Sequence, residues 1–164
     1  MRRKIMKGMA AGVAAAGLAV LVSGPAWAAG SPLPASGTFL VTSATVDSLS
    51  TADGNTIVVL TVGGIITGTF AGSFTETDRE VVHPGGLVTE QGKGVQSGTL
   101  GTCGTGSVPY TAGFTGNGST ASGRTQFVDQ ADSTSTPMKI QSVMRFTFND
   151  VTGEGIYTGT YHCT

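Results

Sequence analysis

The stretch that decides the fold is ITGTFAGSFT, residues 66–75. Its even positions hold Ile, Gly, Phe, Gly and Phe, whereas its odd positions hold only Thr, Ala and Ser. Because successive side chains of a β-strand point to opposite faces, this alternation gives one apolar face and one hydroxyl-bearing face. The pattern predicts a half-buried strand through these residues.

The same period of two recurs along the rest of the chain. Residues 107–115 and 138–149 alternate in the same way, and their apolar faces hold Val108, Tyr110, Ala112 and Phe114, and Met138, Ile140, Met144, Phe146 and Phe148. Between turn signals such as Asp-Gly, Pro-Gly and Asn-Gly, further strands are expected over residues 37–46, 56–63, 93–101, 121–129 and 155–163. No stretch after residue 28 has apolar residues at helical spacing, and the 26 glycines disfavour helices. The sequence therefore predicts an all-β fold of about eight strands.

Glycine alternates with phenylalanine on the predicted inward faces. Small residues beside large ones suit a narrow, strongly curved sheet, and glycine permits the bends that let a sheet close. A two-layer sandwich, the alternative, would more often show continuous Val, Ile and Leu on its inner faces. We predict a single small antiparallel β-barrel. Within it, the similar segments GIITGTF at 64–70 and GIYTGTY at 155–161 are interpreted as two strands in equivalent positions.

The N-terminus has the features of an export signal. Four basic residues precede an apolar stretch over residues 8–22, and Ala26-Trp27-Ala28 has small residues at the positions that a signal peptidase recognises. We expect a signal peptide over residues 1–28, a flexible segment over 29–36, a barrel domain over 37–164, and secretion without a membrane anchor. The first residues, RRKIMK from position 2, fit either the general secretory route or the twin-arginine route.

Removal of residues 1–28 would leave five basic against ten acidic residues, a net charge of about −5. Such a surface repels phosphate groups, so nucleic-acid binding and membrane-surface binding are not expected. Two cysteines, Cys103 and Cys163, remain in a chain that would enter an oxidising compartment. There a bonded pair is the usual state, so we predict one disulfide.

Several segments together resemble a known family. They are the Thr-Gly-Thr-Phe run at 67–70, the segment TETDR at 75–79 before a hairpin at 83–86, the strand end SGTLG at 97–101 and the terminal TGTY at 158–161. This spacing is similar to that of small secreted bacterial proteins of uncharacterised function with an allene oxide cyclase-like, or calycin-like, barrel. The resemblance covers nearly all of residues 29–164. It implies an eight-stranded antiparallel barrel, and it carries over neither cyclase activity nor any pocket residue.

Candidate catalytic residues are few. Glu76 and Asp78 have the same parity as Phe74, so both could point into one end of the barrel and share a proton or a cation as paired carboxylates. Alternatively, the strand leaves the core before residue 76 and both groups meet water. His83, close in sequence to several carboxylates, could act as a base or metal ligand, or could simply lie at a solvated hairpin tip. The spacing indicates no metal site and no cofactor.

Seven inward-facing residues are expected to line a cavity for a small apolar ligand, or else to fill the interior. They are Phe70, Phe74, Tyr110, Phe114, Met144, Phe146 and Phe148. The leading hypothesis is a secreted, non-enzymatic barrel that either binds such a molecule or acts through its outer surface. The alternatives are a cyclase- or isomerase-type enzyme that uses the carboxylates at the barrel mouth, and an envelope module that acts through its threonine-rich outer surface.

Overall fold

A computed structural model of the protein describes residues 31–117, 120–127 and 140–164. The expected signal peptide and Met138 lie outside these residues. The described part is built almost entirely of β-strands, which confirms the predicted all-β class. The strands are β1 (Leu33–Ala52), β2 (Asn55–Gly68), β3 (Phe70–Val82), β4 (Val88–Leu100), β5 (Thr105–Gly116), β6 (Thr120–Phe127), β7 (Ile140–Asn149) and β8 (Glu154–Cys163), and a short 3-10 helix, η1 (Gly101–Cys103), follows β4. No helix in this part of the chain is long and apolar enough to cross a membrane.

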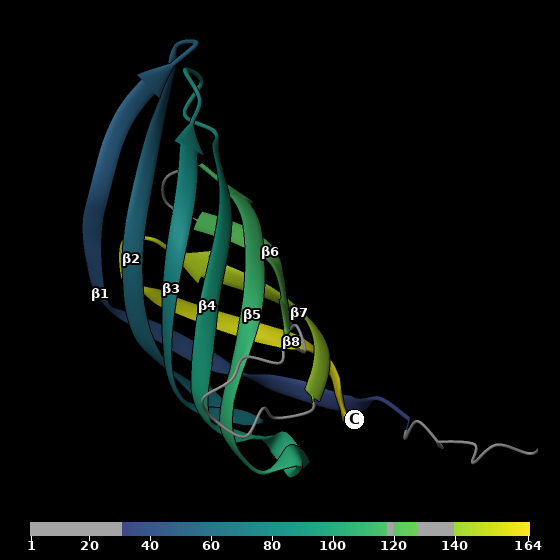
Figure 1. The fold of residues 1–164 in the computed structure, drawn as a ribbon. Helices are drawn as coiled ribbons and strands as arrows, with labels where there is room; N and C mark the ends of the chain where they lie inside the picture. Colours follow the sequence, from purple (N-terminus) through teal and green to yellow (C-terminus); the bar gives the residue numbers. More distant parts are fainter. Residues whose placement is uncertain (1–30, 118–119, 128–139) are drawn as a thin grey trace, which may run out of the picture.

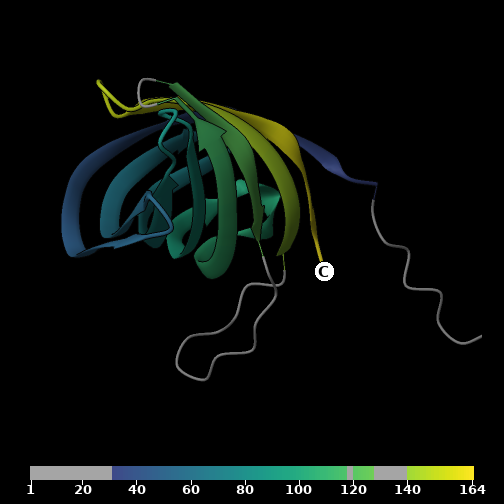
Figure 2. The ribbon, with the colours of Figure 1, turned by 90° about the horizontal axis from the view of Figure 1, so that it is seen from above.

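The eight strands form one closed antiparallel barrel in sequence order, with β8 paired to β1 (Figure 1). Seen from above, the strands wrap around a common interior (Figure 2). A barrel rather than a sandwich is therefore confirmed. The connections β1–β2, β3–β4, β5–β6 and β7–β8 all lie at one end of the barrel, here named the open end. The chain enters β1 at the other end, here named the closed end.

The barrel wall is unequal at its two ends. β8 pairs with β1 only through Leu33–Leu40, and the rest of β1, Val41–Ala52, pairs with β2 alone among the described residues. Two β-bulges, at Val41/Ser43 and Val46/Ser48, bend this free half of β1. In Figure 1 the β1–β2 and β3–β4 hairpins extend at the top beyond β6, β7 and β8. The wall is thus complete at the closed end and interrupted beside β1 at the open end.

Several strand boundaries differ from the predicted ones. β1 begins at Leu33, not at residue 37, and Ala35 is already buried. The single strand predicted over 66–75 is wrong, because β2 ends at Gly68 and β3 begins at Phe70. Gly68 has a φ of +105°, a conformation that glycine adopts without strain, and this allows the chain to reverse there.

The similar segments at 64–70 and 155–161 are consequently not equivalent. The first crosses the turn between β2 and β3, whereas the second runs inside β8 without interruption. The similarity therefore does not mark two strands in the same position of the barrel, and that interpretation is wrong.

The closed end holds a dense core. Phe70, Leu100 and Ile140 are completely buried there, with Tyr157 and Tyr161 packed against them. The Tyr157 hydroxyl accepts a hydrogen bond from the Phe70 N–H at 2.9 Å and donates to the Thr67 carbonyl at 3.1 Å, so the buried phenol is satisfied. The predicted disulfide is confirmed: Cys103 in η1 is bonded to Cys163 at the end of β8.

Inward aromatic rings lie over glycines of the neighbouring strand. Phe74 is paired in register with Gly64, and the space where a Gly64 side chain would begin is occupied by the Phe74 ring. Tyr110 covers Gly94 in the same way. The alternation of glycine with large residues therefore lets rings cross the narrow interior without collision.

Gly64→Ala is expected to lower the free energy of unfolding by about 1–3 kcal/mol, because the new methyl group would meet both the Phe74 ring and the Leu40 carbonyl oxygen. Urea unfolding followed by circular dichroism measures the change. Gly113→Ala is the control, since its methyl group would make only an ordinary contact, 3.7 Å from the Glu90 carbonyl oxygen. Equal losses in the two variants would contradict the role given to Gly64.

Candidate functional site

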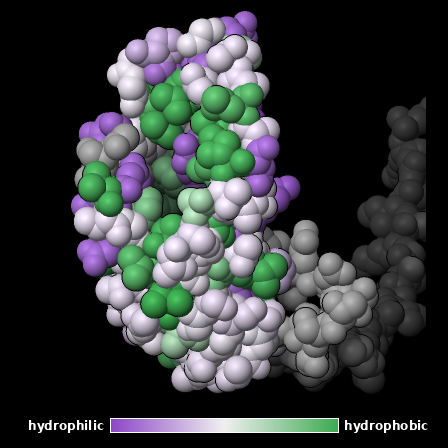
Figure 3. All heavy atoms as spheres, turned by 90° about the vertical axis from the view of Figure 1, so that its left-hand side faces the viewer, coloured by the Kyte–Doolittle hydropathy of each residue, from purple (hydrophilic) through white to green (hydrophobic). Residues whose placement is uncertain are grey.

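A cavity of about 460 Å³ occupies the interior between the closed-end core and the open end. Its walls are mainly apolar and come from β1 to β5, β7 and β8. On the side of the molecule shown in Figure 3, hydrophobic atoms gather around a hollow. The barrel interior is therefore not completely filled by its own side chains.

Six of the seven residues expected to line a ligand cavity do line it, namely Phe74, Tyr110, Phe114, Met144, Phe146 and Phe148. Phe70 does not. As the first residue of β3 it lies in the closed-end core, where its ring packs against those of Tyr157 and Tyr161 at centroid distances of 5.9 and 5.4 Å. Phe70 thus supports the floor below the cavity.

Four carboxyl side chains reach the cavity from two neighbouring strands. Glu76, Asp78 and Glu80 alternate along β3, and Glu90 of β4 is paired in register with Glu80. Asp78 is only 5% exposed and Glu90 only 7%. Because Asp78 is buried within β3, the alternative in which this strand leaves the core before residue 76 and both groups meet water is wrong.

Glu76 is the centre of a hydrogen-bonded group. The Tyr110 hydroxyl donates to Glu76 Oε2 at 2.9 Å, and the Asp78 carboxyl hydrogen-bonds with the same glutamate. Oε1 of Glu76 and Oδ1 of Asp78 both face Gly92, which is opposite Asp78 on β4 and leaves room for them. These two buried oxygens have no donor partner unless a proton lies on one of the carboxyl groups.

The environment favours that proton. Burial, reinforced by the charge of Glu76, raises the pKa of Asp78 to about 8. Burial, the charge of Asp78 and a hydrogen bond to Glu80 raise the pKa of Glu90 to about 10. Burial also raises the pKa of Glu76, although the hydrogen bonds from Tyr110 and Asp78 oppose that change. These raised pKa values favour the protonated forms of Asp78 and Glu90 at neutral pH, and in those forms both can act as donors.

His83 does not join these carboxyl groups. It follows the last residue of β3, and its ring hydrogen-bonds outside the cluster, Nδ1 to Asn55 Oδ1 at 3.0 Å and Nε2 to Thr89 Oγ1 at 3.3 Å. The interpretation of His83 as a base beside Asp78, Glu80 and Glu90 is therefore not supported. Across the described ranges, no three His, Cys, Asp or Glu side chains are arranged to hold a metal ion.

Glu90 and Gln96 also belong to the site, although the sequence pattern placed Glu90 only among the carboxylates near His83 and predicted no role for Gln96. Gln96 is 2% exposed, lines the cavity, and its Nε2 has no hydrogen-bond partner. The signal was present in the alternation Glu90, Gly92, Gly94, Gln96 along one face. It was missed because the strand was expected to begin at residue 93, whereas β4 begins at Val88.

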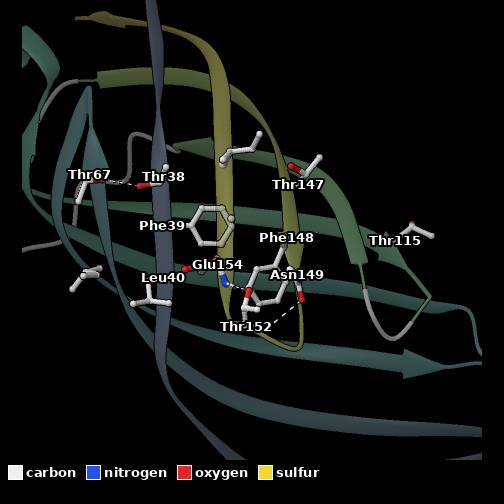
Figure 4. A pocket seen from close by; sticks show the side chains of 13 residues that line it. Thr38, Phe39, Leu40, Thr67, Thr115, Thr147, Phe148, Asn149, Thr152 and Glu154 are labelled. Atoms are coloured by element: carbon white, nitrogen blue, oxygen red, sulfur yellow. Dashed lines mark hydrogen bonds between the residues drawn. The ribbon is translucent and has the colours of Figure 1, made fainter.

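A second hollow, of about 770 Å³, lies where β1 meets the β7–β8 hairpin (Figure 4). Its wall includes Thr38 and Thr67, whose hydroxyls are 2.8 Å apart. Phe39 and Phe148, with stacked rings 5.7 Å apart, line both this hollow and the interior cavity. None of the buried carboxyl groups lines the outer hollow, so the interior cavity is the better candidate site.

No protein-family model matches this sequence, and no curated protein matches it either.

Proposed function

We propose that the protein is an exported barrel that binds a small, largely apolar molecule in its interior. The observation that carries the proposal is the cavity of about 460 Å³ beside the incomplete part of the wall. Sites for small molecules are typically concave, about 300–1,000 Å³ in volume, and apolar with a few placed polar groups. Aromatic walls with the Glu76, Asp78 and Gln96 side chains among them fit this description.

Export is supported by two features of the chain. The first 28 residues have the pattern of a signal peptide, and the Cys103–Cys163 disulfide suits an oxidising compartment. The proposed relationship to secreted allene oxide cyclase-like barrels is supported by the eight-stranded antiparallel topology and by the glycine and threonine spacing.

Titration with N-phenyl-1-naphthylamine, a neutral probe that fluoresces in apolar surroundings, tests the proposal. The wild-type protein should bind it, and Ala112→Trp, which places an indole in the cavity, should weaken binding at least about tenfold. Thr111→Trp is the matched control, because residue 111 is exposed and does not line the cavity. Absence of binding to the wild-type protein, or equal binding by both variants, would refute interior binding.

A second candidate is an acid–base enzyme of the cyclase or isomerase type. It is favoured by the pKa of Asp78, raised by burial to about 8 beside a second carboxyl group, because acid–base catalysis works best with a pKa near the working pH. In this case Asp78 would donate a proton and Glu76 would accept one. Unchanged turnover of a bound substrate by Glu76→Ala would dismiss this function.

A further inference from the structure

The charged side chains that line the cavity are all acidic. They are Glu76, Asp78, Glu80, Glu90 and Asp150, and no Lys, Arg or His is among the described lining residues. The basic residues of the same strands, Arg79, Lys93 and Arg145, occupy positions of the opposite parity and are exposed. Among the described residues, no basic side chain thus reaches the buried carboxyl groups.

Polar atoms in the cavity also lack partners. Asp78 and Gln96 are more than nine-tenths buried, yet Asp78 Oδ1 and Gln96 Nε2 have no hydrogen-bond partner. Glu76 Oε1 is buried without one as well. Burying such groups without partners is unfavourable, so a bound molecule that supplies the missing partners gains affinity. Apart from the proton that the Asp78 carboxyl itself carries, the described residues offer the Glu76 and Asp78 oxygens no donor, so a bound donor group can take the place of that proton.

Apolar side chains flank these carboxyl groups. Val62 and Leu60 of β2 are paired in register with Glu76 and Asp78, and Phe114 of β5 is paired with Glu90. Apolar walls offer a bare metal ion no ligands. An anionic ligand would be repelled by the carboxylates. The ammonium group of an alkylamine has N–H donors and a positive charge, both of which suit the carboxylates. Its charge also interacts favourably with aromatic rings, and the alkyl part of the amine fits the apolar walls.

We propose that the ligand of the cavity is an organic amine, with its ammonium group between Glu76 and Asp78 and its apolar body against the aromatic wall. This inference rests on the proposed interior binding and specifies the ligand class. Binding is a proton exchange: the protonated Asp78 carboxyl loses its proton to solvent, and the ammonium group takes the place of that proton beside the two oxygens. Charge balances, since one cation enters and one proton leaves.

Amine affinity should therefore increase as the pH rises from 6 toward 8. The titratable groups that face Asp78 within the cavity are Glu76 and Glu80 of β3, Glu90 of β4 and Tyr110 of β5, and Asp150 lines the same cavity. The carboxyl groups among them all favour a cation once ionised. The amine itself stays protonated throughout this pH range.

Three ligands that share a phenylalkyl chain and differ in their polar group test the inference. They are 4-phenylbutylamine, 4-phenylbutan-1-ol and 4-phenylbutanoate. Their affinities are measured by displacement of N-phenyl-1-naphthylamine at pH 7.5. The amine should bind at least about tenfold more tightly than the alcohol, and the anion more weakly than either. If the probe binds but the alcohol competes as well as the amine, the ligand class is wrong while interior binding stands. If the probe does not bind, interior binding itself fails.

Two variants locate the charge. Glu76→Gln and Asp78→Asn should each reduce the amine's advantage over the alcohol about tenfold, with the alcohol itself little affected. Glu154→Gln is the matched control, because this exposed carboxyl lines only the outer hollow. A loss of amine affinity in the control alone would place the ammonium outside the barrel and overturn the inference.

Discussion

At pH 8 the double variant Asp78→Asn/Glu90→Gln should be more stable than the wild-type protein by roughly 2–5 kcal/mol, whereas at pH 4 the two should differ by less than about 1 kcal/mol. The reason is that burial raises the pKa of both carboxyl groups in the folded protein, to about 8 for Asp78 and about 10 for Glu90. A buried amide is neutral at every pH. The double variant therefore does not lose stability as the pH rises, whereas the wild-type protein must either keep these buried carboxyl groups protonated or bury their charges.

The sign follows from proton binding. Between the unfolded pKa values near 4 and the raised folded values, the folded protein holds protons that the unfolded chain has released. The stabilisation from these groups is complete below about pH 4 and is lost as the pH rises through the folded pKa values. The free energy of unfolding of the wild-type protein should consequently decrease from pH 5 to pH 9. It would increase with pH only if folding lowered the pKa values of these carboxyl groups.

Urea unfolding followed by circular dichroism at intervals from pH 4 to pH 9 measures both slopes. Glu154→Gln is again the control and should follow the wild-type curve, because its carboxyl group is exposed. A wild-type stability that does not decrease from pH 5 to pH 9, or a double variant no more stable than the wild-type protein at pH 8, would contradict the raised pKa values of Asp78 and Glu90.

Loss of the disulfide should have a similarly large effect. The double variant Cys103→Ser/Cys163→Ser should lose about 4 kcal/mol, because the bond closes a loop between residues 60 apart and restricts the unfolded chain. The bond also fixes η1 against the end of β8, beside the Tyr161 hydroxyl that accepts from the Thr102 N–H at 3.1 Å.

Urea unfolding of the wild-type protein with and without reductant, beside the double variant, measures this contribution. Reduction should lower the wild-type midpoint and leave the variant unchanged. Intact mass after alkylation should show two modified thiols only when reduction comes first. Alkylation of the untreated protein, or equal midpoints for all samples, would contradict a stabilising disulfide.

The strand pattern could be predicted because it depends on local alternation. The parity that places Phe74 inward also places Glu76 and Asp78 inward, and the structure agrees. The turn at Gly68 could not be predicted in this way, since the alternation of small and large residues continues through it without a Pro-Gly or Asn-Gly signal. There the reversal depends on a glycine conformation, which a hydrophobic pattern does not reveal.

The cavity depends on features that the sequence pattern does not contain. Whether Phe70 fills the interior or lines a cavity is decided by its height in the barrel, and therefore by strand register. The room for the Glu76 and Asp78 oxygens comes from Gly92 on another strand. The pairing of Glu80 with Glu90 likewise follows from the position of the β3–β4 turn, which sets the register of the two strands.

Calorimetry of 4-phenylbutylamine binding at pH 7, in two buffers with different heats of ionisation, tests the acidic interior most directly. The apparent binding enthalpies should differ by the amount that corresponds to release of about one proton per amine bound, as the Asp78 carboxyl ionises beside the ammonium group. Binding with no difference between the buffers would mean that no carboxyl group releases a proton when the amine binds, and would contradict the proposed exchange at Asp78.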